Sequence, residues 1–305
     1  MDIKKLIQEN RKIKEITLNS YLISLKKLND NQEIKDLNFL KDYDKIIKIL
    51  DTKKLTTKRN YLTSVLVVLS AFDKEEFNEV LKKYRLLLDE LTKQLNKQYQ
   101  ENQKNQKENK NWTNLRTLKK VMRNNLKEIE ERDLKNKETL TKKENELIKL
   151  TLIGLLYTEL IPKRLDYAPM SIIKSRNDIK PNINYLLNLG RNKKYFIIQE
   201  YKTSNRYGLK EILIPKKINT LLNIYLKFHN QDSFLLDSKG KALTSNGLGK
   251  LIPKAFEKIG KNITVNLIRH IWVTENCDIE KIKKNKELSK EMCHSLNTQE
   301  NYFKK

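Results

Sequence analysis

A polar segment near residue 100 divides this chain. From Thr92 to Asn111 the sequence is almost wholly Lys, Gln, Asn and Glu, and Leu95 and Tyr99 are its only apolar residues. Such a segment cannot bury enough apolar surface to join a core, so we expect a linker or an extended solvated helix. A chain of 305 residues is long enough for two domains. We therefore predict a first domain over residues 1–91, the linker or helix over 92–111, and a second domain over 112–305.

The chain is strongly basic. Its 63 Lys and Arg residues outnumber its 38 Asp and Glu residues, which gives a formal net charge of +25. Such an excess favours a polyanionic partner, above all nucleic acid, and predicts salt-sensitive binding. Part of the lysine excess is typical of an AT-rich genome, because Lys, Asn and Ile are abundant while Gly and Pro number only 7 and 5. Charge therefore favours DNA binding without establishing it.

Cysteine usage and hydropathy exclude several classes of protein. Cys277 and Cys293 are too few for a disulfide framework and lack the paired spacing of a zinc site, so we expect a reducing compartment. The most apolar stretch, from Leu150 to Leu156, is too short to span a bilayer, and the first residues lack the apolar region of a signal peptide. We expect a soluble, intracellular protein with no metal, no cofactor and no membrane contact.

Residues 11–90 are typical of a small helical domain. Thr17 is expected to cap one helix, and Thr56 or Thr57 a second. Apolar residues at helical spacing predict that both helices contribute to one core. These core positions are Leu18, Tyr21, Leu22, Leu25 and Leu28 in the first helix, and Tyr61, Val65, Val68 and Phe72 in the second.

Basic residues gather at the start of the second of these helices. They are Lys53, Lys54, Lys58 and Arg59. The backbone N–H groups and the dipole at a helix N-terminus already favour a phosphate, so the cluster is a candidate DNA-binding site. A solvated basic face is an equally good interpretation.

The second domain combines helical and strand patterns. Helices are expected over residues 115–126 and 144–157 and again after Lys216, with Thr244 to Asn246 as a cap signal. Three short apolar runs between Asn182 and Pro215 predict a three-stranded antiparallel sheet, with Gly190 to Asn192 as its first turn. The predicted fold is mostly α with a small antiparallel β-sheet, in which a helical DNA-binding domain precedes an α+β domain. The runs are Ile183 to Leu187, Tyr195 to Ile198, and Leu209 to Ile214.

Five polar residues of the second domain form a set suited to phosphodiester chemistry. Arg164 and Arg269 can each hold two phosphate oxygens with a planar fork. His294 can donate a further hydrogen bond, and the hydroxyl of Tyr302 can attack phosphorus to give a covalent ester. Lys202 lies on the connection between the second and third expected strands, at a hairpin tip from which its ammonium can reach a leaving group.

Taken in order, Arg164, Lys202, Arg269, His294 and Tyr302 resemble the active-site set of the tyrosine recombinases, the phage-type integrase family. The match spans roughly the last half of the chain, from about residue 140. The resemblance implies that the two arginines clamp the scissile phosphate, that Lys202 protonates the departing 5′-oxygen, and that Tyr302 forms a 3′-phosphotyrosyl link. It further implies an integrase of a virus or mobile element, which acts on double-stranded DNA without ATP or metal.

The chain departs from the family pattern at Asn266, where His or Lys is usual. An amide can donate a hydrogen bond but cannot shuttle a proton, so either catalysis is slower or His270 compensates. Asp166 is close to where the family often has a supporting acid, and we expect it to orient an arginine or histidine. His294 precedes Tyr302 by eight residues, one fewer than the commonest spacing.

Several alternatives stay open. Arg206 competes with Lys202 as the proton donor, because both lie on the same connection. A type IB topoisomerase uses a very similar residue set, usually after a β-rich domain, and a non-catalytic DNA-binding relative would account for Asn266. Only three residues follow Tyr302, so we expect no C-terminal helix of the kind that many members dock into a neighbouring subunit. The isolated protein should then be monomeric, with a tetramer forming on DNA.

Overall fold

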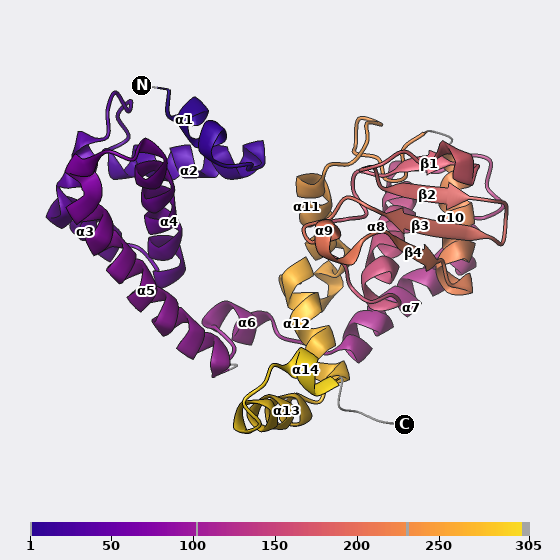
Figure 1. Cartoon of the computed structure of the whole chain (residues 1–305). Helices are drawn as coiled ribbons and strands as arrows, with labels where there is room; N and C mark the ends of the chain where they lie inside the picture. Colours follow the sequence, from indigo (N-terminus) through magenta and orange to yellow (C-terminus); the bar gives the residue numbers. More distant parts are fainter. Residues whose placement is uncertain (1, 102, 230–231, 301–305) are drawn as a thin grey trace. The chain divides into compact units, whose positions relative to one another are not determined.

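The computed structural model describes residues 2–101, 103–229 and 232–300, without the side chains of Asn297 and Glu300. The chain divides into two compact units, residues 1–104 and 105–305. In the part that is described, unit 1 contains helices and no strand, whereas unit 2 combines helices with one small sheet (Figure 1). The predicted fold class, mostly α with a small β-sheet, is confirmed.

Unit 1, as described, packs five α-helices around one apolar core. The central helix is α4, whose residues Leu62, Val65 and Val68 are completely buried and which contacts each of the other four. Tyr84 is also completely buried, and its hydroxyl donates a hydrogen bond to the Leu40 carbonyl at 2.9 Å. The helices are α1 (Ile3–Asn10), α2 (Glu15–Leu28), α3 (Tyr43–Asp51), α4 (Leu55–Phe72) and α5 (Asn78–Gln100).

The caps predicted for α2 and α4 are wrong. Each helix begins about one half-turn before its predicted threonine, after Lys14 and Lys54, and neither start has a side-chain cap. Thr17 and Thr57 already donate their backbone N–H groups to the Lys14 and Lys54 carbonyls, at 2.9 and 2.8 Å. The reason is that an extended lysine supplies the first helical carbonyl in both cases, so these threonines lie inside the first turn.

The polar segment of residues 92–111 is mainly helical. Its first part continues α5 to Gln100, and α6 (Gln106–Asn111) follows. Leu91 and Leu95 are both buried, which shows that α5 continues to pack beyond residue 91. The two units meet in the sequence between residues 104 and 105, whereas the predicted first domain ends at residue 91 and the predicted second domain begins at residue 112.

Unit 2 is organised around α8 (Lys142–Thr158), which is buried without interruption from Thr151 to Thr158. It contacts α7, α10 and α11. A side chain at Gly154 would place its Cβ atom within 2.0 Å of the sulfur of Met122 on α7, so the glycine permits this close helix packing. Thr244 caps α11 as predicted, accepting a hydrogen bond from the Gly247 N–H at 3.0 Å. The remaining helices are α7 (Leu115–Glu131), α9 (Ser204–Tyr207), α10 (Lys216–Phe228), α11 (Ser245–Ala255), α12 (Val265–Asn276), α13 (Ile279–Glu291) and α14 (Leu296–Glu300).

The sheet has four strands in the order β1-β2-β3-β4, and three of them were predicted. β2, β3 and β4 are antiparallel, with Leu186 opposite Phe196 and Phe196 opposite Ile212. The additional strand β1 pairs parallel with β2, so the sheet is mixed. The connection from β3 to β4 contains α9 and is therefore longer than a hairpin tip. The strands are β1 (Ser171–Ile173), β2 (Tyr185–Asn188), β3 (Lys194–Ile198) and β4 (Lys210–Leu213).

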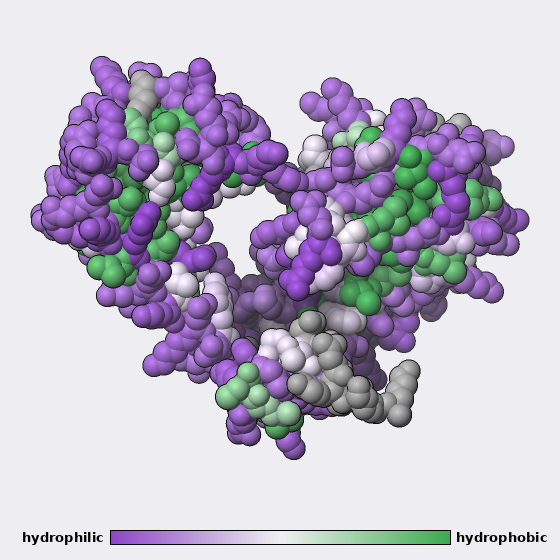
Figure 2. All heavy atoms as spheres, in the orientation of Figure 1, coloured by the Kyte–Doolittle hydropathy of each residue, from purple (hydrophilic) through white to green (hydrophobic). Residues whose placement is uncertain are grey.

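The surface agrees with the charge of the chain. Figure 2 shows that hydrophilic side chains cover most of the visible face of each unit, with smaller apolar areas between them. Within the residues described, the structure contains no helix with the length and apolar character needed to cross a membrane.

Glu144 is a position where pH should change the stability of unit 2. Its carboxylate accepts hydrogen bonds from Lys137 Nζ at 2.6 Å and from the N–H and hydroxyl of Thr141 at 2.9 Å. Lys137 first, and then Thr141, lower the pKa of Glu144 to about 2. A carboxylate with a depressed pKa contributes stability that is present above its unfolded pKa, about 4.3, and is lost as the pH falls through the folded value.

We therefore expect the melting temperature to fall more steeply from pH 5 towards about 2 in the wild type than in Glu144→Gln. Circular dichroism at several pH values measures both slopes. Because all other carboxylates are shared, the difference between the two proteins isolates Glu144. Parallel pH profiles would contradict the prediction.

Candidate active site in unit 2

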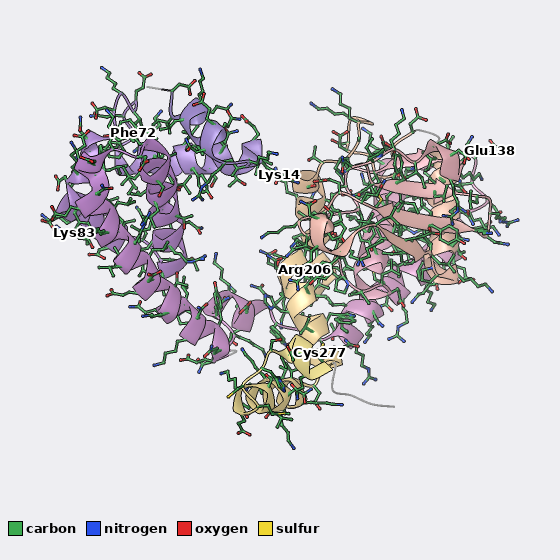
Figure 3. All side chains as sticks on the ribbon, in the orientation of Figure 1. Lys14, Phe72, Lys83, Glu138, Arg206 and Cys277 are labelled. Atoms are coloured by element: carbon green, nitrogen blue, oxygen red, sulfur yellow. The ribbon has the colours of Figure 1, made fainter. Side chains whose placement is uncertain are left out.

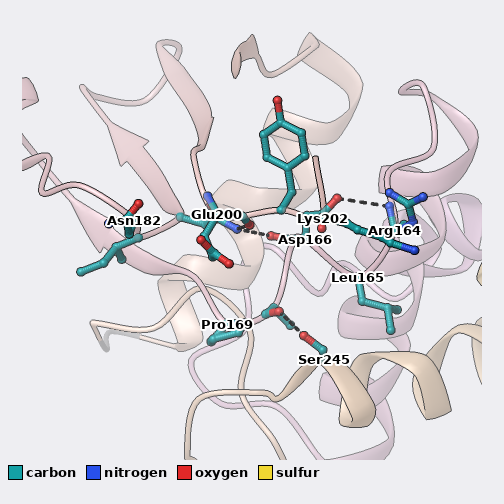
Figure 4. A pocket seen from close by; sticks show the side chains of 12 residues that line it. Arg164, Leu165, Asp166, Pro169, Asn182, Glu200, Lys202 and Ser245 are labelled. Atoms are coloured by element: carbon teal, nitrogen blue, oxygen red, sulfur yellow. Dashed lines mark hydrogen bonds between the residues drawn. The ribbon is translucent and has the colours of Figure 1, made fainter. Parts of the chain in front are cut away.

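A cavity of about 510 Å³ opens where three connecting segments of unit 2 meet. The segment after α8 contributes Arg164 and Asp166, and the segment after β3 contributes Lys202. Figure 4 shows these three side chains grouped, with Asn182 on the far side. The other lining residues are Leu165, Ala168, Pro169, Ile183, Asn184, Glu200, Tyr201 and Ser245.

Arg164 is held at the cavity by its backbone. Its N–H group donates to Asp166 Oδ2 at 3.3 Å, and its carbonyl accepts the hydroxyl of the buried Tyr157 at 2.5 Å. Pro162, which cannot continue a helix, fixes the turn after α8. The Arg164 side chain itself is exposed, so its guanidinium is available to an anion in the cavity.

Arg269 of α12 is not among the residues that line the cavity, but the charges of Arg164 and Asp166 act on it. It is half-buried, and its pKa is lowered chiefly by burial and then by the positive charge of Arg164, while Asp166 opposes the shift. Two guanidinium groups that repel one another would both be stabilised by a shared anion. Because each presents a planar fork of N–H donors, a phosphate is a suitable anion for the pair.

Asp166 is one of two carboxylate residues that line the cavity, together with Glu200. Burial raises the pKa of its carboxyl above the ordinary value, while the Arg164 N–H and the charges of Arg164, Lys163 and Arg269 act in the opposite direction. A half-buried acid between two arginines can orient them and limit their repulsion. The supporting role expected for Asp166 stays a prediction.

The candidate proton donors differ in their surroundings. Lys202 is exposed and lines the cavity. Arg206 lies on α9 (Figure 3), outside the lining of the cavity, and its guanidinium is 5.2 Å from the centre of the Tyr207 ring. Lys202 is therefore better placed to meet a ligand of the cavity than Arg206.

The other predicted residues that the structure describes do not line the cavity. His294 precedes α14, is half-buried, and has its Nδ1 atom 3.2 Å from the Ser295 carbonyl. Tyr302 lies outside the described residues. Asn266 is exposed on α12, one turn before Arg269. His270 follows Arg269 but points elsewhere, because successive helical residues differ by about 100°, and its Nε2 atom is 3.7 Å from Glu108 Oε1.

Asn184 was not identified from the sequence, although it joins the two segments that carry the cationic groups. Its amide nitrogen donates to the carbonyls of Asp166 and Glu200 at 3.1 and 2.9 Å. Its amide oxygen accepts the N–H groups of Gln199 and Glu200, both at 2.8 Å. Asn184 is buried, so these bonds satisfy its polar atoms away from water. The available signal was one polar residue in the apolar run that predicted β2.

The predicted DNA-binding cluster lies in unit 1, at the start of α4. Lys53 and Lys54 are exposed, and Lys54 is the residue before the helix. Lys58 is half-buried and pairs with Asp51 at 2.7 Å. Arg59 Nε donates to the Thr92 hydroxyl at 3.4 Å. Two of the four cations therefore have partners within the unit.

The described residues include no group of three or more His, Cys, Asp or Glu side chains that could hold a metal ion. Both cysteines are free thiols, with Cys277 half-buried and Cys293 exposed. The polar side chains that line the cavity belong to arginine, lysine, carboxylate, amide and hydroxyl residues.

Comparisons with known proteins give little guidance. No family model matches the sequence, and no curated protein matches it. Among solved structures, a crystal structure of XerA recombinase is similar at 11% sequence identity, covering 90% of this chain and 81% of that chain, with a TM-score of 0.33. A TM-score this low supports no conclusion about fold or function, so the function must be argued from the side chains.

Proposed function

We propose that this protein is a DNA strand transferase of the tyrosine recombinase type. The observation that carries the proposal is that Arg164 and Lys202, about 40 residues apart, line one cavity, with Arg269 close enough for Arg164 to lower its pKa. An arginine and a lysine in the cavity lining, with a second arginine near the first, suit a phosphodiester, whose charge increases as it is attacked. The order of these residues in the chain, followed by His294 and Tyr302, is the order found in that family.

In the proposed reaction the phenolic oxygen of Tyr302 attacks the scissile phosphorus. The bond from phosphorus to the 5′-oxygen breaks, the phenolic proton passes to solvent, and Lys202 protonates the departing oxygen. Arg164, Arg269 and His294 stabilise the pentavalent phosphorane. Because the phosphotyrosyl ester conserves the energy of the broken bond, attack by a 5′-hydroxyl reverses the step without ATP or metal.

Covalent capture tests this proposal. A duplex with a nick close to the cleavage site loses its short 5′-hydroxyl fragment after cleavage, so the phosphotyrosyl adduct should accumulate and be visible in a denaturing gel. We expect the adduct to form in the presence of EDTA. Random duplexes can substitute for the unknown target by selecting the molecules that become attached. A protein that binds DNA but never becomes attached to it would be a non-catalytic relative.

A type IB topoisomerase is the second candidate, because the same residue set would nick and reseal one duplex. The helical character of unit 1 favours the recombinase, since the topoisomerases usually have a β-rich domain at that position. Relaxation of supercoiled DNA without exchange of strands between two duplexes would instead support the topoisomerase.

We further propose that unit 1 contacts duplex DNA through Lys53 and Lys54, together with Lys58 and Arg59, and that tetramers assemble on DNA. The exposed positions of Lys53 and Lys54 support the first part. An integrase of a virus or mobile element is the biological role that fits a basic strand transferase. Sedimentation with and without duplex DNA tests the assembly.

Sulfur substitution at the leaving group should identify the proton donor. If Lys202 protonates the 5′-oxygen, Lys202→Ala should cleave ordinary DNA roughly 10²- to 10⁴-fold more slowly. The defect should largely disappear with a 5′-bridging phosphorothioate, because a thiolate leaves without protonation. Single-turnover cleavage of both substrates measures the rescue. Arg206→Ala provides the comparison, and rescue of Arg206→Ala but not of Lys202→Ala would assign the role to Arg206.

A further inference from the structure

The charges of α7 run opposite to the order that stabilises a helix. Its first nine residues contain Arg116, Lys119, Lys120 and Arg123, and its first acidic residue is Glu128. A helix dipole favours acidic residues in the first turn and basic residues in the last, and α7 has neither. Arg116, which lies in the first turn where the dipole acts, therefore costs some stability, so folding alone does not explain its position.

Two of the three acidic residues of α7 pair with cations other than Arg116, Lys120 and Arg123. Glu128 pairs with Arg132 at 2.8 Å and with Lys258 at 3.4 Å, and Glu131 pairs with Lys127 at 3.4 Å. The Glu275 carboxylate accepts the Leu115 N–H at 3.0 Å. Arg116, Lys120 and Arg123 are exposed and have no ion pair with any residue that the structure describes.

These three cations form a continuous face. Spacings of four and three residues place them along one side of the helix, over a length of about 10 Å. With Thr117 and Asn124 they line a shallow hollow of about 570 Å³. On one strand of B-DNA, a length of about 10 Å along the helix axis contains on the order of three phosphates. We call Arg116, Lys120 and Arg123 the α7 stripe.

The composition of this face favours nucleic acid over a membrane or an acidic protein. The apolar residues of α7, including Leu118 and Met122, are buried or half-buried against the core, so the stripe offers no apolar surface to lipid or to a protein interface. Only 11 of the 63 basic residues of the chain are arginine, and two of these lie in the stripe. Arginine matches phosphate oxygens with its planar fork better than lysine does.

We propose that the α7 stripe binds the phosphate backbone of duplex DNA at a second position on unit 2, separate from the cavity. None of its residues lines the cavity, and the cavity lining contains no residue of α7. The identity of the partner as DNA rests on the proposed function. The stripe would lengthen the DNA footprint beyond the cleavage site without taking part in the chemistry.

The test compares two triple variants that lose the same charge. One is Arg116→Gln/Lys120→Gln/Arg123→Gln, and the matched control is Lys174→Gln/Lys193→Gln/Lys239→Gln, at exposed positions of unit 2. Affinity for a duplex of about 40 base pairs is measured over a range of salt concentrations. Each lost phosphate contact reduces the magnitude of the slope of log affinity against log salt by about 0.9. The magnitude of this slope should therefore fall by about 2 to 3 in the stripe variant and by less than about 1 in the control.

Two further measurements separate the possible outcomes. The stripe variant should melt at the same temperature as the wild type or higher, because it loses the cation at Arg116 from the positive end of the helix dipole and no ion pair of the described residues. If the triple variant does not fold, the double variant Lys120→Gln/Arg123→Gln takes its place, and the magnitude of its slope of log affinity against log salt should fall by about 2. Adduct formation on a short nicked duplex should be unchanged. Equal slope changes in the stripe variant and the control would overturn the proposal that the α7 stripe binds DNA, but not the proposed function. A wild-type protein that binds no duplex would overturn the proposed function.

Discussion

Replacing Tyr302 with Phe should abolish the covalent protein–DNA adduct completely. The substitution removes only the hydroxyl that would attack phosphorus, so residue 302 can no longer form a phosphotyrosyl bond. Duplex affinity should change by no more than about twofold, because the phosphate contacts that dominate binding come from the basic side chains. Denaturing gels detect the adduct, and a binding titration on the same duplex measures the affinity.

Tyr201→Phe is the matched control. Tyr201 lines the cavity next to Lys202, but its hydroxyl donates to the Gly208 carbonyl at 2.7 Å. The variant should therefore still form the adduct. If Tyr302→Phe forms the adduct at the wild-type level while Tyr201→Phe does not, the nucleophile is Tyr201 and the assignment of Tyr302 is wrong.

The sheet shows what short-range sequence patterns can predict. Apolar runs around Leu186, Phe196 and Ile212 predicted β2, β3 and β4, because short runs of apolar residues bounded by turn residues leave a local signal. β1 was missed because it has only three residues and pairs parallel with β2, so it leaves neither a long apolar run nor a hairpin signal. Thr244 was recognised as a cap, whereas at α2 and α4 an extended lysine took the place of the expected threonine.

Lys194 illustrates a feature that no local pattern reveals. Lys194 is only 2% exposed. Its ammonium donates to the Gly190 and Arg191 carbonyls and to the side chains of Asn219 and Asn223, at 2.7 to 3.1 Å. Burial lowers the pKa of Lys194. In so basic a chain, one lysine among many gives no signal, and two of its four acceptors lie on α10. The hydrogen bonds of this ammonium join the first turn of the sheet to α10, so the burial of Lys194 depends on tertiary packing.

Only part of the cavity could be predicted from the sequence, because its other features also depend on tertiary packing. The order of Arg164, Lys202 and Arg269 indicated a phosphodiester site, and the fold brings the first two to one cavity. The raised pKa of Asp166 depends on burial and on charges from separate segments, so the sequence alone could not predict it. Asn184 likewise acts through backbone groups of distant residues, which a residue motif does not include.

Replacing Arg269 with Ala should slow cleavage by roughly 10²- to 10³-fold, the usual effect of removing one donor to a developing negative charge. Arg269 would contact the phosphate most strongly when it becomes a pentavalent phosphorane, so duplex affinity should fall only a few-fold, about 3 or less. Single-turnover cleavage at saturating protein separates the chemical step from binding. Because Arg269 is half-buried beside Arg164, the loss of its charge should also relieve repulsion and leave thermal stability nearly unchanged.

Two further variants distinguish charge from geometry. Arg269→Lys keeps the positive charge but loses the planar fork, so it should recover only part of the rate. Arg176→Ala removes an arginine of the same unit that pairs bidentately with Glu211, at 2.8 and 2.6 Å, outside the cavity lining, and it should cleave at close to the wild-type rate. If Arg269→Ala weakens duplex binding as much as it slows cleavage, Arg269 binds the phosphate equally well in the uncleaved duplex and in the phosphorane, and it does not specifically stabilise the phosphorane. Equal losses in Arg269→Ala and Arg176→Ala would show that the effect is one of net charge, and the arginine pair would then have no specific role at the scissile phosphate.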